Sequence, residues 1–141
     1  MRGFTLIELV VVVAVLLALA VVAAPRLFDR TGFDARGFHD QALSVIRFAQ
    51  KTAVAQRRTV FVRVTAGGVE ACYDAACAAP LTDPARGGAL AVAAPSGIGL
   101  APAATVSFDP LGRPGAGASI NVTGDVPRVI VIEPETGYVH S

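Results

Sequence analysis

The sequence of 141 residues predicts an α+β protein with a long apolar N-terminal helix, a second packed helix and an antiparallel β-rich C-terminal head. Three observations predict this class. From Phe4 to Ala24, 19 of 21 residues are apolar. Residues 35–57 carry apolar side chains every three or four positions, the spacing of an amphipathic helix. Beyond residue 58, short stretches of alternating polarity are separated by glycine and proline, as in antiparallel strands.

The apolar N-terminal segment is long enough to cross a membrane. A helix of 21 residues spans roughly 30 Å, the thickness of a bilayer core, and residues 9–24 carry no charge. A cleaved signal peptide is the alternative, but an acid ahead of the apolar run and a proline after the candidate cleavage site are unfavourable there. These two residues are Glu8 and Pro25. Pro25 either kinks the helix or marks its end.

The acidic residue of this segment either lies in the lipid headgroup region or needs a cationic partner, because a carboxylate in apolar surroundings is costly. Cleavage of the chain after Gly3 would create a new ammonium on Phe4. Glu8 would then lie one helical turn away, at the spacing that brings side chains together. The same carboxylate could instead bind the ammonium of a neighbouring copy.

The run Gly3-Phe4-Thr5-Leu6-Ile7-Glu8, followed by an unbroken apolar helix, resembles the class III signal of type IV pilins and type II secretion pseudopilins. The resemblance implies the type IV pilin fold, cleavage between Gly3 and Phe4 by a prepilin peptidase, and N-methylation of Phe4. It also implies that Glu8 pairs with the N-terminus of an adjacent subunit. Residues 1–3 are then the leader peptide, 4–30 the transmembrane and filament-core helix, and 31–141 the periplasmic or extracellular head. In this family a proline at the place of Pro25 is associated with a softened helix in the filament.

The second helix follows an interruption that we expect at Thr31-Gly32, with Asp34 as its N-cap. Its opposite faces differ in polarity, so one face packs on a core and the other is a solvated face or a subunit contact. The expected core positions are Phe38, Ala42, Val45, Ala49 and Ala53, and the polar face holds Arg36, Asp40, Ser44, Arg47 and Lys51.

The rest of the chain is expected to form short strands. Eight of the nine prolines lie between residues 80 and 134, which excludes long helices there. Gly67-Gly68 is expected to turn a hairpin, and residues 75–104 are expected to be mostly loops. The predicted strands are 59–65, 69–72, 89–93, 105–108, 119–122, 128–132 and 138–140.

Two parts of the head extend the resemblance. The helix over residues 33–58 and the turn Phe108-Asp109-Pro110-Leu111-Gly112-Arg113 are similar to the subgroup of general secretion pathway protein H and the FimT/FimU pilins. The runs at 33–38 and 135–140 look like minor pilins of the mannose-sensitive haemagglutinin (MSHA) pilus.

The only cysteines, Cys72 and Cys77, are five positions apart. In an exported head such a pair favours a disulfide, which would stabilise by roughly 2 kcal/mol. Free thiols and a metal site are the alternatives. A metal site needs about four ligands, and the only histidines, His39 and His140, are far apart in sequence. We therefore expect neither a metal ion nor a cofactor.

Motifs of catalysis are missing from the sequence. It contains no G-x-S-x-G elbow, Walker loop or H-E-x-x-H. His39 and Asp40 are adjacent on a helix and are not expected to face each other. We therefore predict that the protein is not an enzyme.

The sequence thus predicts a minor pilin or pseudopilin that helps to start or extend a filament. Its expected partners are other pilin subunits, a prepilin peptidase, an inner-membrane assembly platform and, through a single-pass helix, the membrane. The head is expected in the periplasm, and after assembly in the pilus or pseudopilus and at the cell surface. The count of basic residues, three arginines after the helix against one before it, favours the opposite orientation, with the N-terminus outside. We follow the motif and not this count.

Two alternatives stay open at this point: a DNA-binding minor pilin and a membrane-anchored periplasmic domain that never polymerises. A net charge of +1 and the scattered positions of Arg86, Arg113 and Arg128 make nucleic-acid binding the less favoured function.

Overall fold

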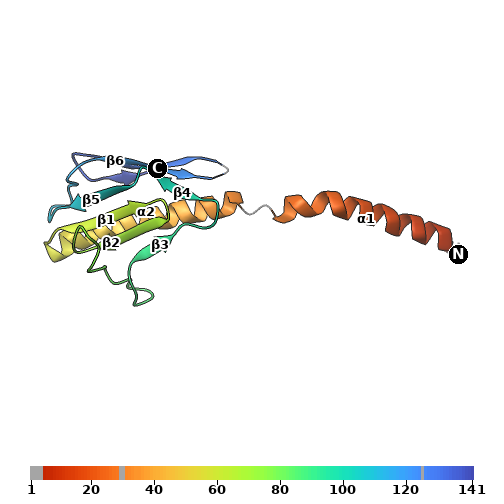
Figure 1. Ribbon diagram of the computed structural model, residues 1–141, viewed down its shortest axis with the longest axis horizontal. Helices are drawn as coiled ribbons and strands as arrows, with labels where there is room; N and C mark the ends of the chain where they lie inside the picture. The colour runs from red at the N-terminus through yellow and green to blue at the C-terminus, as the bar shows by residue number, and fades with distance from the viewer. Residues whose placement is uncertain (1–4, 29–30, 125) are drawn as a thin grey trace. The chain divides into compact units, whose positions relative to one another are not determined.

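The structure, a computed structural model, describes residues 5–28, 31–124 and 126–141. The chain divides into two units, Met1–Arg30 and Thr31–Ser141, which are described separately below (Figure 1). Among the described residues, the first unit holds helix α1, and the second unit holds helix α2 and eight strands.

Helix α1 spans Leu6–Phe28. It begins directly after Thr5, whose carbonyl and hydroxyl oxygens both accept from the backbone N–H of Glu8, at 3.1 and 3.4 Å. Thr5 thus satisfies a backbone donor that the first helical turn leaves free. The helix continues through Pro25 to Phe28, so the expectation that it ends at Pro25 is wrong. A kink at Pro25 stays a prediction. Within the described part of the chain, no helix is both long enough and apolar enough to cross a membrane.

Helix α2 spans Thr31–Gln56, so the interruption expected at Thr31-Gly32 is wrong. A glycine costs little in the first turn, where the backbone N–H groups have no helical partner in any case. Asp34 lies inside that turn and not at the N-cap. In the first turn its negative charge is still favourable near the positive end of the helix. The helix ends because Arg57 adopts a left-handed conformation (φ 49°) and Arg58 N–H donates back to the Ala53 carbonyl at 3.2 Å.

The buried face of α2 contains all five positions that the spacing predicted, together with Ala35, His39 and Ile46, which it missed. His39 is 3% exposed, and its Nδ1 lies 3.0 Å from Asp40 Oδ1. The expectation that these neighbours do not interact is therefore wrong. The ring of His39 lies at the border of the buried face, and Asp40 extends from the exposed side to meet it.

Four antiparallel strands form the first sheet, in the order β3-β2-β1-β5. They are β1 (Val60–Thr65), β2 (Gly68–Cys72), β3 (Ala91–Ala93) and β5 (Ala104–Phe108). Alternate residues of β1 face the core, as predicted, and Phe61 and Arg63 lie on the other face. Gly68 belongs to β2, and β3 is two residues shorter than predicted.

The second sheet is also antiparallel and has the order β4-β6-β7-β8. It contains β4 (Gly99–Ala101), β6 (Ala118–Thr123), β7 (Arg128–Ile132) and β8 (Val139–His140). The sequence did not predict β4, which has only three residues.

Helix α2 packs on both sheets, and one apolar core lies between the three layers (Figure 1). Two long side chains of α2 bind backbone groups of the second half of the head. Arg47 donates from Nε and Nη2 to the Val139 carbonyl at 3.0 and 2.8 Å. Gln50 Nε2 donates to the Gly112 carbonyl at 2.9 Å. These bonds hold β8 and the turn after β5 against the helix.

Candidate functional site

The first candidate site is the start of α1. Glu8 lies in the first helical turn, where its negative charge is favourable, and its side chain is exposed. Gly3 and Phe4 lie outside the described residues, so the structure does not place the cleavage point relative to Glu8. Glu8 is the only charged residue between positions 5 and 21.

The apolar side chains around Glu8 are also exposed. Within the described part of α1 they point outward on every side of the helix, with exposed fractions from 47% at Val13 to 81% at Leu6. A helix that is apolar all round is stable only with apolar surroundings, such as lipid or other helices. Glu8 is therefore a single carboxylate on a surface that needs to be covered.

The second feature is the loop between β2 and β3, which is closed by a disulfide between Cys72 and Cys77. The disulfide expected for a cysteine pair in an exported head is thus confirmed. Asp74 organises the turn inside the loop, because its carboxylate accepts from Ala78 N–H at 3.0 Å and Ala79 N–H at 2.8 Å. The bond from Ala79, followed by that from Ala78, lowers the pKa of Asp74 below its ordinary value of 3.8.

Two arginines contact this disulfide loop. Arg63 pairs with Glu70 across the β1–β2 ladder and donates from Nη1 to the Ala76 carbonyl at 3.1 Å. The guanidinium of Arg58 lies 4.0 Å from the centre of the Tyr73 ring, a cation–π contact. Glu70 and the two sulfur atoms lie within 4.8 Å of one another. The sulfurs are bonded together and the carboxylate is paired with Arg63, so these three residues are not arranged as ligands.

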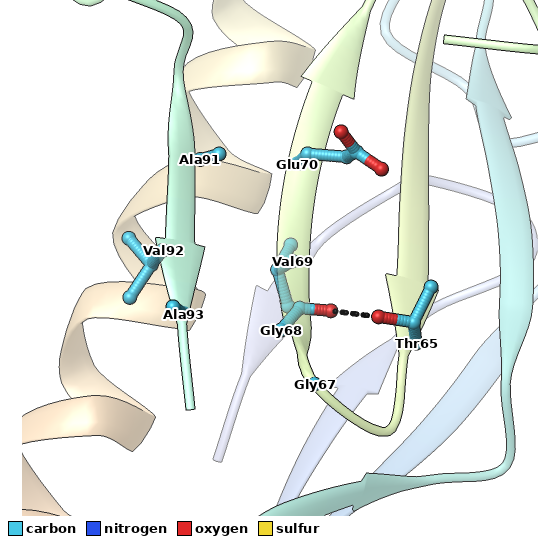
Figure 2. A pocket seen from close by; sticks show the side chains of 8 residues that line it. All are labelled: Thr65, Gly67, Gly68, Val69, Glu70, Ala91, Val92 and Ala93. Atoms are coloured by element: carbon cyan, nitrogen blue, oxygen red, sulfur yellow. Dashed lines mark hydrogen bonds between the residues drawn. The ribbon is translucent and has the colours of Figure 1, made fainter. Parts of the chain in front are cut away.

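A hollow of about 190 Å³ lies over β2, β3 and the β1–β2 turn (Figure 2). Its walls are mostly small side chains and backbone, with Thr65 donating to the Gly68 carbonyl at 3.3 Å. Glu70 is the only ionisable residue among the eight that line it, and Figure 2 shows its carboxylate turned towards β1. The hollow therefore offers no pair of nucleophile and base.

The two histidines lie in different surroundings. His39 is buried in α2, and its Nε2 has no hydrogen-bond partner among the described residues. His140 in β8 pairs with Glu133 at 3.0 Å and stacks on Tyr138, with ring centroids 5.3 Å apart. The three arginines considered for nucleic-acid binding also lie on separate segments: Arg86 in the loop before β3, Arg113 in the turn after β5, and Arg128 at the start of β7.

Two family models match the chain. Type II transport protein GspH matches residues 40–136, well over half of the chain. The prokaryotic N-terminal methylation motif matches residues 1–24, the segment that contains Gly3, Phe4 and Glu8. No protein with a curated description matches.

Two solved structures share the fold, both of the type IV minor pilin FimU of Pseudomonas aeruginosa (strain PAO1). The crystal form in space group P65 has a TM-score of 0.56 at 15% identity, over 74% of this chain and 90% of that chain. The form in space group P21 has a TM-score of 0.53 at 16% identity, over 79% and 87%. The α+β fold predicted from the sequence is thus confirmed as that of a type IV pilin.

Proteins of this family and fold are structural subunits and not enzymes, as the sequence predicted. Type IV pilin-like proteins are anchored in a membrane with a periplasmic head, are processed by a prepilin peptidase and assemble with other pilin subunits. The chain therefore belongs to the family of type II transport protein GspH and is a minor pilin or pseudopilin.

Proposed function

We propose that this minor pilin matures by cleavage between Gly3 and Phe4, is methylated on Phe4, and uses Glu8 to enter a filament. Residues 4–30 first hold the subunit in the inner membrane as a single-pass helix, with residues 31–141 in the periplasm. An assembly platform then transfers it into a pilus or pseudopilus, where it assists filament initiation and reaches the cell surface in a pilus.

The observation that carries the proposal is the exposed carboxylate of Glu8 in an otherwise apolar, exposed stretch of α1, residues 6–21. Packing α1 among other apolar helices removes Glu8 from water. An unpaired charge in such surroundings is strongly destabilising, by about 3–5 kcal/mol when one partner of a buried pair is missing. The free ammonium of a cleaved neighbour supplies the missing charge, because attraction between opposite charges is stronger where water is excluded.

This pairing also explains why the leader needs to be removed before assembly. With residues 1–3 attached, Phe4 has an uncharged peptide nitrogen and offers Glu8 no cation. Cleavage creates the ammonium at the same end of the helix as the carboxylate. Processing therefore converts an anchored precursor into a subunit that can bind the next one.

We further propose that the filament is an MSHA-type pilus. The support is the resemblance of residues 33–38 and 135–140 to minor pilins of that system. The structure places Phe33 on the exposed side of α2, 83% exposed, and Tyr138 before β8, 61% exposed. Both aromatic side chains are therefore accessible to other subunits.

Mass spectrometry of the full chain, expressed with and without a prepilin peptidase, tests maturation. The expected product begins at Phe4 and carries one methyl group on its nitrogen. A mature N-terminus at any other residue would refute the proposal.

The variants Glu8→Ala and Glu8→Gln test the pairing. Glu8→Gln keeps the shape of the side chain and removes its charge, and Glu135→Gln is a matched control on the head. We expect both Glu8 variants to reach the membrane and lose their leader, but to be absent from the sheared filament fraction, while the control is incorporated normally. Normal incorporation of Glu8→Gln would contradict the pairing mechanism. Processed wild-type protein that stays entirely in the membrane would support a non-polymerising anchor instead.

A further inference from the structure

One end of the head exposes large apolar side chains on two neighbouring elements. Phe33, in the first turn of α2, is 83% exposed, and Val126, in the turn between β6 and β7, is 57% exposed. The two elements lie against each other, because a Cβ added to Gly124 would lie 2.8 Å from the Ala35 Cβ. In Figure 1 the turn between β6 and β7 reaches the same end of the head as the start of α2.

The segment between β3 and β4 completes this end of the head. Phe33 lines a hollow of about 150 Å³ together with Ala93 and Pro95 from that segment. Gly99 N–H donates to the Thr123 hydroxyl oxygen at 2.9 Å, and the hydroxyl donates back to the Gly99 carbonyl at 3.1 Å, which ties the segment to the end of β6. We call the surface formed by these segments the entry face, namely residues 32–37, 93–99, 123–124 and 126–128.

The charges of the entry face cancel. Its residues include Asp34, Arg36 and Arg128, and Asp125, which lies outside the described residues, precedes Val126 in the sequence. Two acidic and two basic residues give this end of the head no preference for an anionic or a cationic partner. A partner of the entry face is therefore recognised through its exposed apolar side chains.

The chain also enters the head at this face, which limits its distance from the membrane. The apolar run ends at Ala24, and α1 continues as a helix to Phe28. A helical residue rises about 1.5 Å and an extended one spans at most about 3.6 Å, so the chain from Ala24 to Thr31 spans at most about 17 Å. The headgroup region of a bilayer takes up roughly 5–7 Å of this length. A subunit anchored by residues 4–30 thus holds its entry face close to the lipid.

We propose that the entry face docks on the headgroup region of the membrane before the subunit joins a filament. Phe33 and Val126 insert at the border between headgroups and acyl chains, where apolar side chains are removed from water. Because the chain between Ala24 and Thr31 is short, the effective concentration of lipid at the entry face is high, and a small apolar contact is sufficient. This inference rests on the proposed function, since residues 4–30 hold the subunit in the membrane.

The contact is suited to a subunit that later leaves the membrane. Two side chains form a small surface, so the contact is weak once the tether no longer holds it near lipid. Extraction of α1 from the bilayer therefore releases the entry face. Phe33 and Val126 are then exposed again and accessible to other subunits.

Tryptophan fluorescence tests the docking, because the natural chain contains no tryptophan and an introduced one is the only reporter. The full chain carrying Val126→Trp is reconstituted into phosphatidylcholine vesicles, at a low ratio of protein to lipid that keeps subunits apart. Part of the lipid is brominated on its acyl chains near the headgroups, and bromine quenches tryptophan only at close contact. We expect strong quenching. Val126 is a better reporter than Phe33, because it lies far along the chain from Ala24.

Two further tryptophan variants are the controls. Leu111 is 74% exposed, and the turn that contains it packs near the far end of α2, since a Cβ on Gly112 would lie 3.0 Å from Val54 Cγ2. Between Phe33 and Val54 the helix rises about 30 Å, so Leu111→Trp is expected to remain unquenched. Leu16→Trp, within the apolar run, is expected to be quenched by lipid that is brominated deep in its acyl chains.

Phe33→Asp tests whether the two apolar side chains act together. An aspartate in the first turn of a helix is favourable, so α2 keeps its start, but a carboxylate is unfavourable at the border of the acyl chains. We expect Phe33→Asp to lower the ratio of docked to undocked heads, measured by the quenching of Val126→Trp, roughly tenfold, as for the loss of one apolar contact. Leu111→Asp adds the same charge at the far end and is expected to leave the ratio unchanged.

Three results would overturn the inference. They are quenching of Val126→Trp no stronger than that of Leu111→Trp, quenching that Phe33→Asp leaves unchanged, and a blue-shifted emission without quenching, which would mean that protein and not lipid covers the entry face. Leu16→Trp separates this failure from failure of the proposed function. Quenching of Leu16→Trp alone refutes the docking and leaves the membrane anchor intact, whereas no quenching of Leu16→Trp refutes the anchor on which the proposed function depends.

Discussion

Replacing Gly137 with alanine perturbs the place where the turn before β8 meets the turn after β5. Gly137 has a φ of 69°, in the left-handed region. An added Cβ would press on the Gly112 carbonyl and lie 2.7 Å from Gln50 Nε2 and 3.2 Å from Pro114 Cδ. Gly87 is a matched control, because its φ is 73° but nothing lies within 4 Å of an added Cβ. Comparing the Gly137→Ala and Gly87→Ala variants therefore separates the cost of backbone strain, which both share, from the cost of the steric contact at Gly137.

The expected cost follows from these two terms. Left-handed backbone costs a residue with a Cβ about 1–2 kcal/mol, and alanine recovers about 0.4–1 kcal/mol through the unfolded chain. Both variants share this part, so Gly87→Ala loses about 1 kcal/mol. Gly137→Ala adds overpacking against a fixed carbonyl, about 1–3 kcal/mol, and weakens the Gln50–Gly112 bond, about 1 kcal/mol. We therefore expect Gly137→Ala to lose about 3–5 kcal/mol in all.

Thermal unfolding of the full chain in detergent, followed by near-ultraviolet circular dichroism, measures the difference. At about 4 °C per kcal/mol for a domain of this size, Gly137→Ala is expected to melt about 8–16 °C below Gly87→Ala. Equal melting temperatures for the two variants would show that the turns do not meet at Gly137.

Two further predictions concern single side chains of the head. The pKa of Asp74 is lowered in the folded state, so its charge stabilises the fold above pH 3.8, and this contribution is lost as the pH falls through the folded-state pKa. Asp74→Asn is therefore expected to lower the urea midpoint at neutral pH but not in strong acid, and an equal loss at both pH values would contradict this origin. His39 is buried with Nε2 unpaired among the described residues, so His39→Leu is expected to leave the free energy of unfolding unchanged or to raise it by up to about 1 kcal/mol. His39→Ala is expected to lower the same free energy by about 2 kcal/mol through a cavity. Urea denaturation of both His39 variants checks this, and a large loss for His39→Leu would point to a polar partner of Nε2.

Periodic parts of the fold could be predicted because their periods are local. The face of α2 that contains Phe38 and Ala42, and the inward valines of β1, follow from spacing alone. The strand β4 could not be predicted, because Gly99–Ala101 becomes a strand only through pairing with β6, about twenty residues later. The break expected at Gly32 does not occur, because the low helix propensity of glycine costs little in the first turn of a helix.

The candidate sites divide in the same way. Glu8 and the cysteine pair are visible in sequence because each belongs to a short motif with fixed spacing. Contacts between distant segments could not be predicted, because no local pattern joins their residues. Arg47 binds the Val139 carbonyl, 92 positions later, and Gln50 binds the Gly112 carbonyl, 62 positions later.

The bonds from Arg47 to the Val139 carbonyl limit how the protein can be modified for experiments. Val139 is 1% exposed and belongs to the two-residue strand that ends the second sheet, only two positions before the last residue. An affinity tag or fluorescent protein joined directly to Ser141 would strain the pairing of this short strand. Removing the last three residues would expose the core beneath it. Labels are better placed in the 83–88 loop, or joined to Ser141 through a flexible linker.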